Sequence, residues 1–212
     1  MQGFFAAVLD LIIPPRRTEL ILRALTIETL QALRLEISAS RNIAPLPYHD
    51  PRITALVWEL KYHGSPRAAE LGGVLLAEEL LALAAEELGR PILIPIPIHP
   101  NRHRERGFNQ TELLCMHAMR ALSAVGGQKV FEYAPQALAR IKNTPRQQGL
   151  ERAKRLHNLK GSMRAAGPDR IAGRICVVLD DVTTTGATFA EARRALKAAG
   201  TLRVHCVALA QS

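Results

Sequence analysis

Asp180 and Asp181 form an acidic pair between two segments of different character. An apolar run, 175–179, precedes the pair, and a threonine-rich turn, 182–188, follows it. Small hydroxyl side chains and backbone N–H groups at the start of a helix bind phosphate oxygens, because a helix N-terminus carries partial positive charge. Two carboxylates would repel such a phosphate, so we expect them to face vicinal sugar hydroxyls or a pyrophosphate that carries hydrated magnesium.

The surrounding segments predict the elements that position this pair. The run 175–179 is rich in β-branched residues and lacks polar alternation, which is typical of a buried parallel strand, and 189–199 has helical periodicity. Open α/β sheets bind ligands at such strand ends. Phosphoribosyl pyrophosphate, with its phosphate, diol and pyrophosphate, fits these features. A plainer interpretation also stands, in which one Asp caps a helix ahead of an ordinary turn.

A basic segment follows a second apolar run. The run 91–97 contains prolines that limit its pairing, as in a strand that leads directly into a ligand loop. The segment 99–110 carries Arg102, Arg104 and Arg106, whose guanidinium groups suit the oxygens of a pyrophosphate. We expect these arginines to precede a helix over 110–125 that Asn109 caps. The alternative is a solvated basic surface.

A third segment, 139–150, is basic and polar and leads into a charged helix over 151–158. A mobile lid here would shield a reacting sugar carbon from water. Lys142 and Arg146 are its candidate pyrophosphate ligands. A surface hairpin ahead of a charged helix explains the same pattern.

The first part of the chain predicts a separate helical unit. Leucines and isoleucines recur at helical spacing over 16–37, and 42–48 is typical of an extended linker. We therefore expect an N-terminal appendage, 1–44, and a main domain, 45–212. Within the main domain, proline and glycine positions predict helices over 50–64 and 66–89.

Composition restricts the partners and the compartment. The chain of 212 residues has a net charge of +9, and the stretch from Arg102 to Arg174 holds 15 Lys or Arg against 5 Asp or Glu. Such a concentration favours a polyanion, which could be a pyrophosphate, a nucleotide or a nucleic-acid backbone.

Cysteine usage and the N-terminal stretch favour a cytoplasmic protein. The three cysteines lie far apart in apolar contexts, which predicts neither disulfides nor a zinc site. The apolar stretch 4–13 is too short for a membrane span and contains Asp10, so we expect a packing segment.

The segment 176–188 resembles the thirteen-residue signature of type I phosphoribosyltransferases. The resemblance implies that Asp180 and Asp181 hold the ribose hydroxyls and act as the catalytic pair. It also implies a site for the ligand and its 5-phosphate in the residues that follow, namely Val182, Thr183, Thr184, Thr185, Gly186, Ala187 and Thr188.

Further strings across the chain resemble the ComF family of competence-associated proteins. They are Pro47-Tyr-His-Asp-Pro-Arg52, Leu60-Lys-Tyr-His-Gly64, Pro95-Ile-Pro97, Arg106-Gly-Phe-Asn-Gln110, Thr144-Pro-Arg-Gln147 and Arg155-Leu-His-Asn158. The resemblance implies an α/β fold of the type I phosphoribosyltransferase kind, with a mostly parallel central sheet flanked by helices and a small helical appendage at the N-terminus. The last two strings also resemble the phosphoribosyl half of glutamine amidophosphoribosyltransferases, but no glutaminase domain accompanies them.

The chemistry that the resemblance implies is displacement of pyrophosphate from phosphoribosyl pyrophosphate by a nitrogen nucleophile that the sequence does not identify. Mg²⁺ would bind through the ligand and not directly to the protein. Arg102 or Arg106 would hold the pyrophosphate, and Lys61 and Tyr62 are candidates to line the acceptor pocket. Many ComF relatives carry an N-terminal cysteine zinc knuckle, whereas this chain has no cysteine before Cys115, so no zinc is expected.

A different class of function remains open, in which the fold binds single-stranded DNA and competence-machinery proteins without catalysis. The basic middle of the chain favours this alternative. Aromatic residues make up only 4% of the chain, and Phe108, Phe131 and Tyr133 are the candidate stacking platforms. A nucleotide-sensing regulator has no positive signal in the sequence.

Overall fold

The computed structural model describes residues 14–35, 42–127, 129–143 and 159–212. In this part of the chain, the main sheet has six strands in the order β1-β8-β7-β3-β4, with β2 also paired to β8, and every pairing in it is parallel. These strands are β1 (Asn42–Ile43), β2 (Leu46–Pro47), β3 (Ile92–Pro95), β4 (Glu132–Tyr133), β7 (Ile175–Thr183) and β8 (Arg203–Gln211). A separate antiparallel pair joins β5 (Leu138–Arg140) to β6 (Met163–Ala165).

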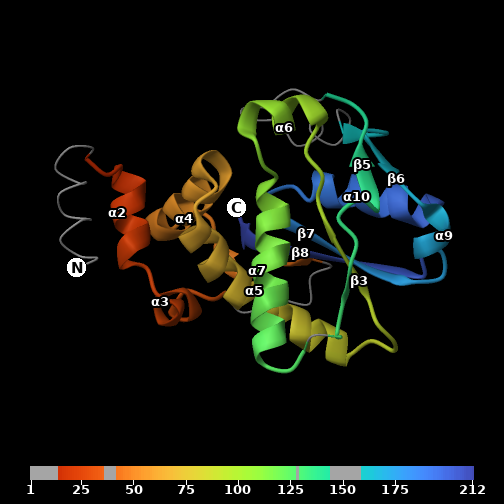
Figure 1. Cartoon of the computed structure of the whole chain (residues 1–212), viewed down its shortest axis with the longest axis horizontal. Coiled ribbons are helices and arrows are strands. Elements are labelled where there is room, and N and C mark those ends of the chain that lie inside the picture. Colours follow the sequence, from red (N-terminus) through yellow and green to blue (C-terminus); the bar gives the residue numbers. More distant parts are fainter. Residues whose placement is uncertain (1–13, 36–41, 128, 144–158) are drawn as a thin grey trace.

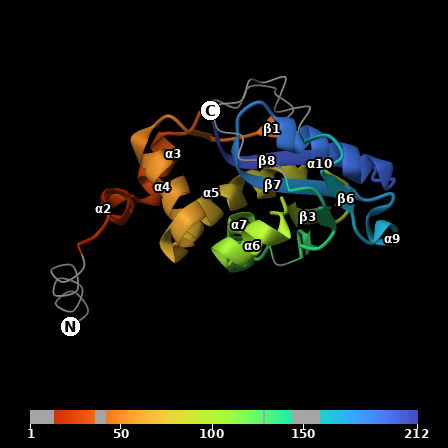
Figure 2. The same ribbon diagram turned by 90° about the horizontal axis from the view of Figure 1, so that it is seen from above.

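Helices cover both faces of the main sheet, which confirms the expected α/β class with a mostly parallel sheet. Helices α5 and α7 lie on one face and α10 on the other (Figures 1 and 2). The helices are α2 (Arg17–Ala24), α3 (Ile27–Ala32), α4 (Pro51–His63), α5 (Pro66–Ala85), α6 (Pro100–Arg106), α7 (Gln110–Ala124), α9 (Pro168–Ile171) and α10 (Ala187–Ala198).

Strand β7 separates two hydrophobic cores. Val177 and Leu179 belong to the core that includes residues of α5 and α7, whereas Cys176 and Val178 belong to the core under α10. Successive side chains of a strand point to opposite faces, so a strand covered on both sides reads as a continuous apolar run. This burial confirms the predicted parallel strand. The strand extends beyond Leu179, however, and includes the acidic pair.

The ends of the first long helix follow the sequence signals closely. Asp50 accepts a hydrogen bond from the backbone N–H of Arg52 at 2.8 Å, and Pro51 occupies the first helical position. Gly64 ends the helix with φ of 56°. The aromatic ring of Phe108 lies 3.0 Å from the point where a Cβ on Gly64 would be, so the glycine also permits close packing with the segment before α7.

Two predicted loops are regular elements in the structure. The stretch 42–48, expected as a linker, contains β1 and β2, which pair with β8, because the exposed edge of β8 offers backbone partners that local sequence does not reveal. The arginine segment expected as a loop forms α6, with Pro100 at its first position. The predicted division at residue 44 stays a prediction, although β1 lies before that boundary and belongs to the main sheet.

The N-terminal helices pack against the body of the protein. Leu22 and Leu25 near the end of α2 and Leu30 of α3 are buried in the same core as α4 and α5. Arg16 and Thr18 hydrogen-bond the carboxylate of Glu59, which is 1% exposed and lies on α4.

Cys115, Cys176 and Cys206 are buried free thiols. Among the described helices, none is long and apolar enough to cross a membrane.

Candidate ligand-binding site

Asp180 and Asp181 lie at the carboxyl end of β7, and their side chains leave the strand on opposite faces of the sheet. The alternation that separates Val178 from Leu179 continues through the pair. Asp181 therefore faces α4 and α7, and Asp180 lies on the side of α10. Both are buried, with 8% of Asp180 and 3% of Asp181 exposed. The two carboxyl groups therefore face different elements, although the charge of Asp181 still acts on Asp180.

Two donors from different helices hold the Asp181 carboxylate. The Lys61 ammonium, from the last turn of α4, lies 3.0 Å from Oδ1. The side-chain amide of Gln110, the first residue of α7, donates to Oδ2 at 2.8 Å. Burial opposes the charge on Lys61, but the Asp181 carboxylate outweighs it, and the pKa of Lys61 is raised. Lys61, expected in an acceptor pocket, is therefore turned toward the acidic pair.

A second layer supports the Gln110 amide. Arg106, at the end of α6, donates to Gln110 Oε1 at 2.5 Å, and its guanidinium lies 5.6 Å from the centre of the Tyr62 ring. Tyr62 stands next to Lys61 on α4 and contacts Trp58, with the ring centres 4.3 Å apart. Lys61, Asp181, Gln110, Arg106 and Tyr62 thus form a closed ring of contacts that joins α4, α6, α7 and β7.

Asp180 lies in a different electrostatic environment. Its Oδ1 accepts the backbone N–H of Asp181 at 2.9 Å. Burial, together with the neighbouring Asp181 charge, raises the pKa of Asp180 to about 7, although Lys61 and Arg140 oppose the shift. Burial lowers the pKa of Arg140, against the attraction of Asp180 and with the repulsion of Arg102. Arg140 thus interacts electrostatically with both Asp180 and Arg102.

The hydroxyl-rich turn follows the acidic pair directly. Strand β7 ends at Thr183, and Gly186, with φ of 72°, precedes the first turn of α10. The Thr185 hydroxyl accepts the N–H of Ala187 at 3.4 Å. A Cβ on Gly186 would lie 3.5 Å from the Asn42 amide nitrogen, so β1 forms one wall of the turn. Hydroxyls and backbone N–H groups at a helix start suit a phosphate.

The end of β3 is fixed beside this site by side-chain hydrogen bonds. Ile96 N–H donates to the Leu179 carbonyl at 2.8 Å, and the Ile96 carbonyl accepts from Asn109 and Thr111. The Arg140 guanidinium donates to the Pro97 carbonyl at 3.1 Å. Asn109 also accepts the backbone N–H of Thr111, which confirms its predicted role as the cap of α7.

The basic residues predicted to bind pyrophosphate lie in different surroundings in the structure. Arg102 acts electrostatically on Arg140, whereas Arg106 is engaged with Gln110 and Tyr62. Lys142 hydrogen-bonds the Lys160 carbonyl at 3.3 Å, beside the start of β6. Arg146 and most of the predicted lid lie outside the described residues. Sequence reasoning missed Gln110 and Arg140; the only local signal was a polar residue just after a predicted helix cap and an arginine at a strand end.

A directly bound divalent cation does not fit the acidic pair. Both oxygens of Asp181 have donors, and Asp180 points away from Asp181 on the other face of the strand. Within the described residues, no group of three or more His, Cys, Asp or Glu side chains could hold a metal ion. Magnesium would need oxygen ligands from a bound substrate.

Comparisons with known proteins identify relatives named for DNA utilization and competence. No protein-family model matches the chain. The DNA utilization protein YhgH of Salmonella typhi is 34% identical over 163 residues, which cover 75% of this chain and 68% of that protein. The competence protein F of Haemophilus influenzae is 30% identical over 121 residues, 57% of this chain and 50% of that protein.

Among solved structures, a hypoxanthine phosphoribosyltransferase from Trypanosoma cruzi covers 69% of this chain and 65% of its own, at 12% identity and a TM-score of 0.44.

Proposed function

This chain belongs to the family of the DNA utilization protein YhgH and competence protein F, and from that premise we propose that it binds phosphoribosyl pyrophosphate together with Mg²⁺ at the carboxyl end of β7. The proposed reaction transfers the phosphoribosyl group to a nitrogen nucleophile and releases pyrophosphate. The proposed setting is the handling of DNA taken up in natural transformation, in keeping with the names of the relatives.

One observation carries this proposal. The buried acidic pair is followed without interruption by the hydroxyl-rich turn that opens into α10, and Arg140 lies within electrostatic range of Asp180. A sugar phosphate with a free diol needs hydrogen-bond acceptors for the hydroxyls and a helix N-terminus for the phosphate, side by side. A helix cap would account for neither the second carboxylate nor the basic groups around it.

The proposed roles follow from the surroundings of each group. The turn from Thr183 to Thr188 would hold the 5-phosphate, and Asp180 and Asp181 would hydrogen-bond the ribose hydroxyls. Arg102 and Arg140, rather than Arg106, would contact the pyrophosphate, because Arg106 is committed to Gln110 and Tyr62. Mg²⁺ would bind the ligand's oxygens and offset charge on the leaving group.

Catalysis in this proposal rests on positioning and electrostatics. The basic groups would stabilise the negative charge that develops on the departing pyrophosphate. The carboxylates would fix the ribose so that its reacting carbon faces the nucleophile. No side chain is assigned as a general base, and the nucleophile enters from the side of α4, where Tyr62 remains its candidate neighbour.

Calorimetric titration of phosphoribosyl pyrophosphate with Mg²⁺ tests the proposal. The wild-type protein should bind, and a double variant, Asp180→Asn with Asp181→Asn, should lose that binding while keeping its circular dichroism spectrum. Asp169→Asn on α9 is the matched control, because this aspartate is exposed and precedes the start of β7, whereas the acidic pair lies at the other end of that strand. Binding to the wild-type protein should then be followed by a search for the acceptor through pyrophosphate release.

Unchanged affinity in the double variant would refute the assignment of the acidic pair. Absence of binding to the wild-type protein would refute the enzyme hypothesis and leave the site as a retained scaffold.

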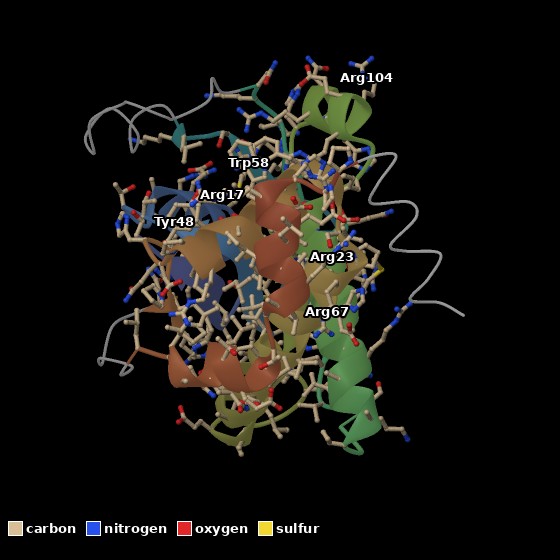
Figure 3. The ribbon with its side chains drawn as sticks, turned by 90° about the vertical axis from the view of Figure 1, so that its left-hand side faces the viewer. Arg17, Arg23, Tyr48, Trp58, Arg67 and Arg104 are labelled. Carbon is tan, nitrogen blue, oxygen red and sulfur yellow. The ribbon has the colours of Figure 1, made fainter. Side chains whose placement is uncertain are left out.

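A second candidate function, binding of single-stranded DNA, is favoured by one exposed surface. Phe131, a stacking candidate from the sequence, is fully buried, whereas Trp58 and Tyr62 are 44% and 39% exposed and contact one another. Arg106 lies over Tyr62, and Arg104 of α6 projects near the top of the face that carries Trp58 (Figure 3). Aromatic rings beside arginines can stack bases while the cations contact phosphates.

Trp58 is the single tryptophan of the chain, so its fluorescence reports on this surface alone. An oligothymidine should quench it, with an affinity that falls as salt rises. Arg104→Gln should weaken binding and lower the salt slope, whereas Arg164→Gln, an exposed arginine on β6, should change neither. Absence of quenching, or an effect equal in both variants, would remove this surface from consideration.

A further inference from the structure

Lys61 reaches the acidic pair from a distant part of the chain. Its ammonium comes from the end of α4 and lies 3.0 Å from Asp181, whose side chain is only 4% exposed. The Lys61 side chain is 27% exposed, so the cation of this ion pair is more accessible than the carboxylate. A buried charge that loses its partner is costly, so this ion pair constrains the ionisation of the acidic pair.

The cations around the two carboxylates are arranged unequally. Asp181 has Lys61 in direct contact, with Gln110 as the neutral second donor. Asp180 interacts with Lys61, with Arg140 from β5 and with the buried Cys206 thiol from β8 through longer electrostatic interactions, and its Oδ1 accepts the Asp181 backbone N–H. Tyr48 is the remaining titratable group that interacts with Lys61.

We propose that Lys61 is a positioning residue that selects Asp181 as the ionised member of the acidic pair and leaves the proton of the pair on Asp180. The proposal rests on the proposed function in one respect: in the ligand complex, Asp181 would be the strong acceptor for a ribose hydroxyl and protonated Asp180 a donor. The ligand would thus meet one acceptor and one donor, and not two equal carboxylates.

The physical basis is the difference between a contact and a longer interaction. Two adjacent carboxyl groups in a buried site hold on to one proton, because two buried negative charges repel. An ammonium at hydrogen-bond distance stabilises the charge on the carboxylate that it touches more than the charge on the other. The raised pKa of Asp180, to about 7, agrees with this division.

Carbon-13 NMR of the aspartate carboxyl groups tests the inference without any ligand. The two resonances are assigned with Asp180→Asn and Asp181→Asn. In the wild-type protein, only the Asp180 resonance should move between pH 5 and pH 9. In Lys61→Gln, which keeps a donor of similar reach but removes the charge, both resonances should move together, with a midpoint about one pH unit or more higher. Lys61→Arg should restore the wild-type pattern.

Two outcomes would overturn the inference. One is a Lys61→Gln protein in which the Asp180 resonance alone still moves, at the wild-type midpoint. The other is a wild-type protein in which both resonances move together. Gln110→Leu removes a neutral donor from Asp181 and should leave the proton on Asp180. This variant therefore distinguishes the effect of the Lys61 charge from that of losing a hydrogen bond at the site. If Lys61→Gln fails to fold, the wild-type titration still tests the position of the proton, and joint movement of the two resonances would refute the inference.

Titration of phosphoribosyl pyrophosphate with Mg²⁺ at pH 6 and pH 9 then extends the test to the complex. The ratio of the dissociation constants of Lys61→Gln and wild type should change by about tenfold or more between these values, whereas a residue that only contacts the ligand would give a constant ratio. Absence of binding by the wild-type protein would refute the proposed function but leave the NMR result intact.

Discussion

Gln110 Nε2 donates to Asp181 Oδ2 at 2.8 Å, although the two residues are 71 positions apart in the sequence. The bond joins the first residue of α7 to the carboxyl end of β7. Gln110 is 7% exposed and also accepts from Arg106. The amide therefore links α6 to the acidic pair through two hydrogen bonds.

Removal of this amide should destabilise the protein. Gln110→Leu keeps the side-chain volume but leaves a buried carboxylate oxygen without that donor, and we expect a loss of about 1–3 kcal/mol in the free energy of unfolding. Urea denaturation measures it. Gln136→Leu, at an exposed position, should stay within about 0.5 kcal/mol of wild type. Equal losses in the two variants would contradict the structural role of the bond.

The contribution of Asp180 to the stability of the protein should fall as pH rises from about 4 to 7. The pKa of Asp180 is about 7 in the folded protein because of burial and the Asp181 charge, against about 3.9 for an unfolded chain. A group whose pKa is raised by folding stabilises the folded state fully below the unfolded pKa, and this contribution is lost as pH rises through the folded pKa.

Asp180→Asn should flatten this dependence. The contribution of Asp180 to the pH dependence is at most about 4 kcal/mol. Urea unfolding at pH 5 and pH 8 should therefore show a smaller difference in the variant than in wild type, with Asp169→Asn as the exposed control. The same pH dependence in Asp180→Asn and wild type would show that another group is responsible.

Glu59 should be a major link between the N-terminal helices and the body. Its carboxylate is 1% exposed and accepts from Arg16 at 2.8 and 3.1 Å and from Thr18 at 2.6 Å. Burial opposes the charge, but these hydrogen bonds outweigh it and lower the pKa of Glu59. Glu59→Gln should lose about 1–3 kcal/mol, because the buried side chain loses charge-assisted hydrogen bonds and its new amide N–H group faces the Arg16 donors.

Glu70→Gln gives the matched comparison, since Glu70 is 56% exposed and pairs with Arg67 at 3.1 Å. This surface pair should contribute about 0–1 kcal/mol. Thermal denaturation of the two variants ranks them, and a Glu70 variant as unstable as the Glu59 variant would contradict the assignment.

Gly73 should tolerate substitution less well than its neighbour Gly72. A Cβ on Gly73 would lie 2.5 Å from His117 Cβ and 2.8 Å from the Ala118 backbone nitrogen, where α5 meets α7. A Cβ on Gly72 would meet the flexible end of Leu114 at 2.8 Å. Because backbone cannot yield as a side chain does, Gly73→Ala should cost about 1–3 kcal/mol more than Gly72→Ala in urea denaturation. The reverse order would show that the helices separate easily.

Arg140 should contribute to anion binding more than its neighbour in the β5–β6 pair. Arg140→Met removes a cation that interacts with Asp180, and we expect phosphoribosyl pyrophosphate to bind about 10- to 100-fold more weakly. Arg164→Met, at an exposed position on β6, should leave the affinity within about threefold. Calorimetry with Mg²⁺ measures both, and similar affinities for the two variants would remove Arg140 from the site.

The local pattern of residues determined much of this protein. The apolar run before Asp180, the hydroxyls after it and the cap at Asn109 are short-range signals, and the structure contains the strand, the start of the helix and the cap that they predict. These features depend on backbone preferences and on burial of neighbouring side chains, which neighbours in the sequence specify. Because successive side chains of a strand alternate between its two faces, the sequence also determined that the two carboxyl groups lie on opposite faces.

Tertiary structure alone decided what surrounds the acidic pair. Lys61 and Gln110 reach Asp181 because α4 and α7 pack on one face of the sheet. Arg140 interacts with Asp180 because β5 packs on the opposite face, in the core under α10. Likewise, the stretch predicted as a linker forms β1 and β2 because it pairs with the edge of β8. Such contacts join residues far apart in the chain, and their geometry depends on how whole elements pack, so no local pattern specifies them.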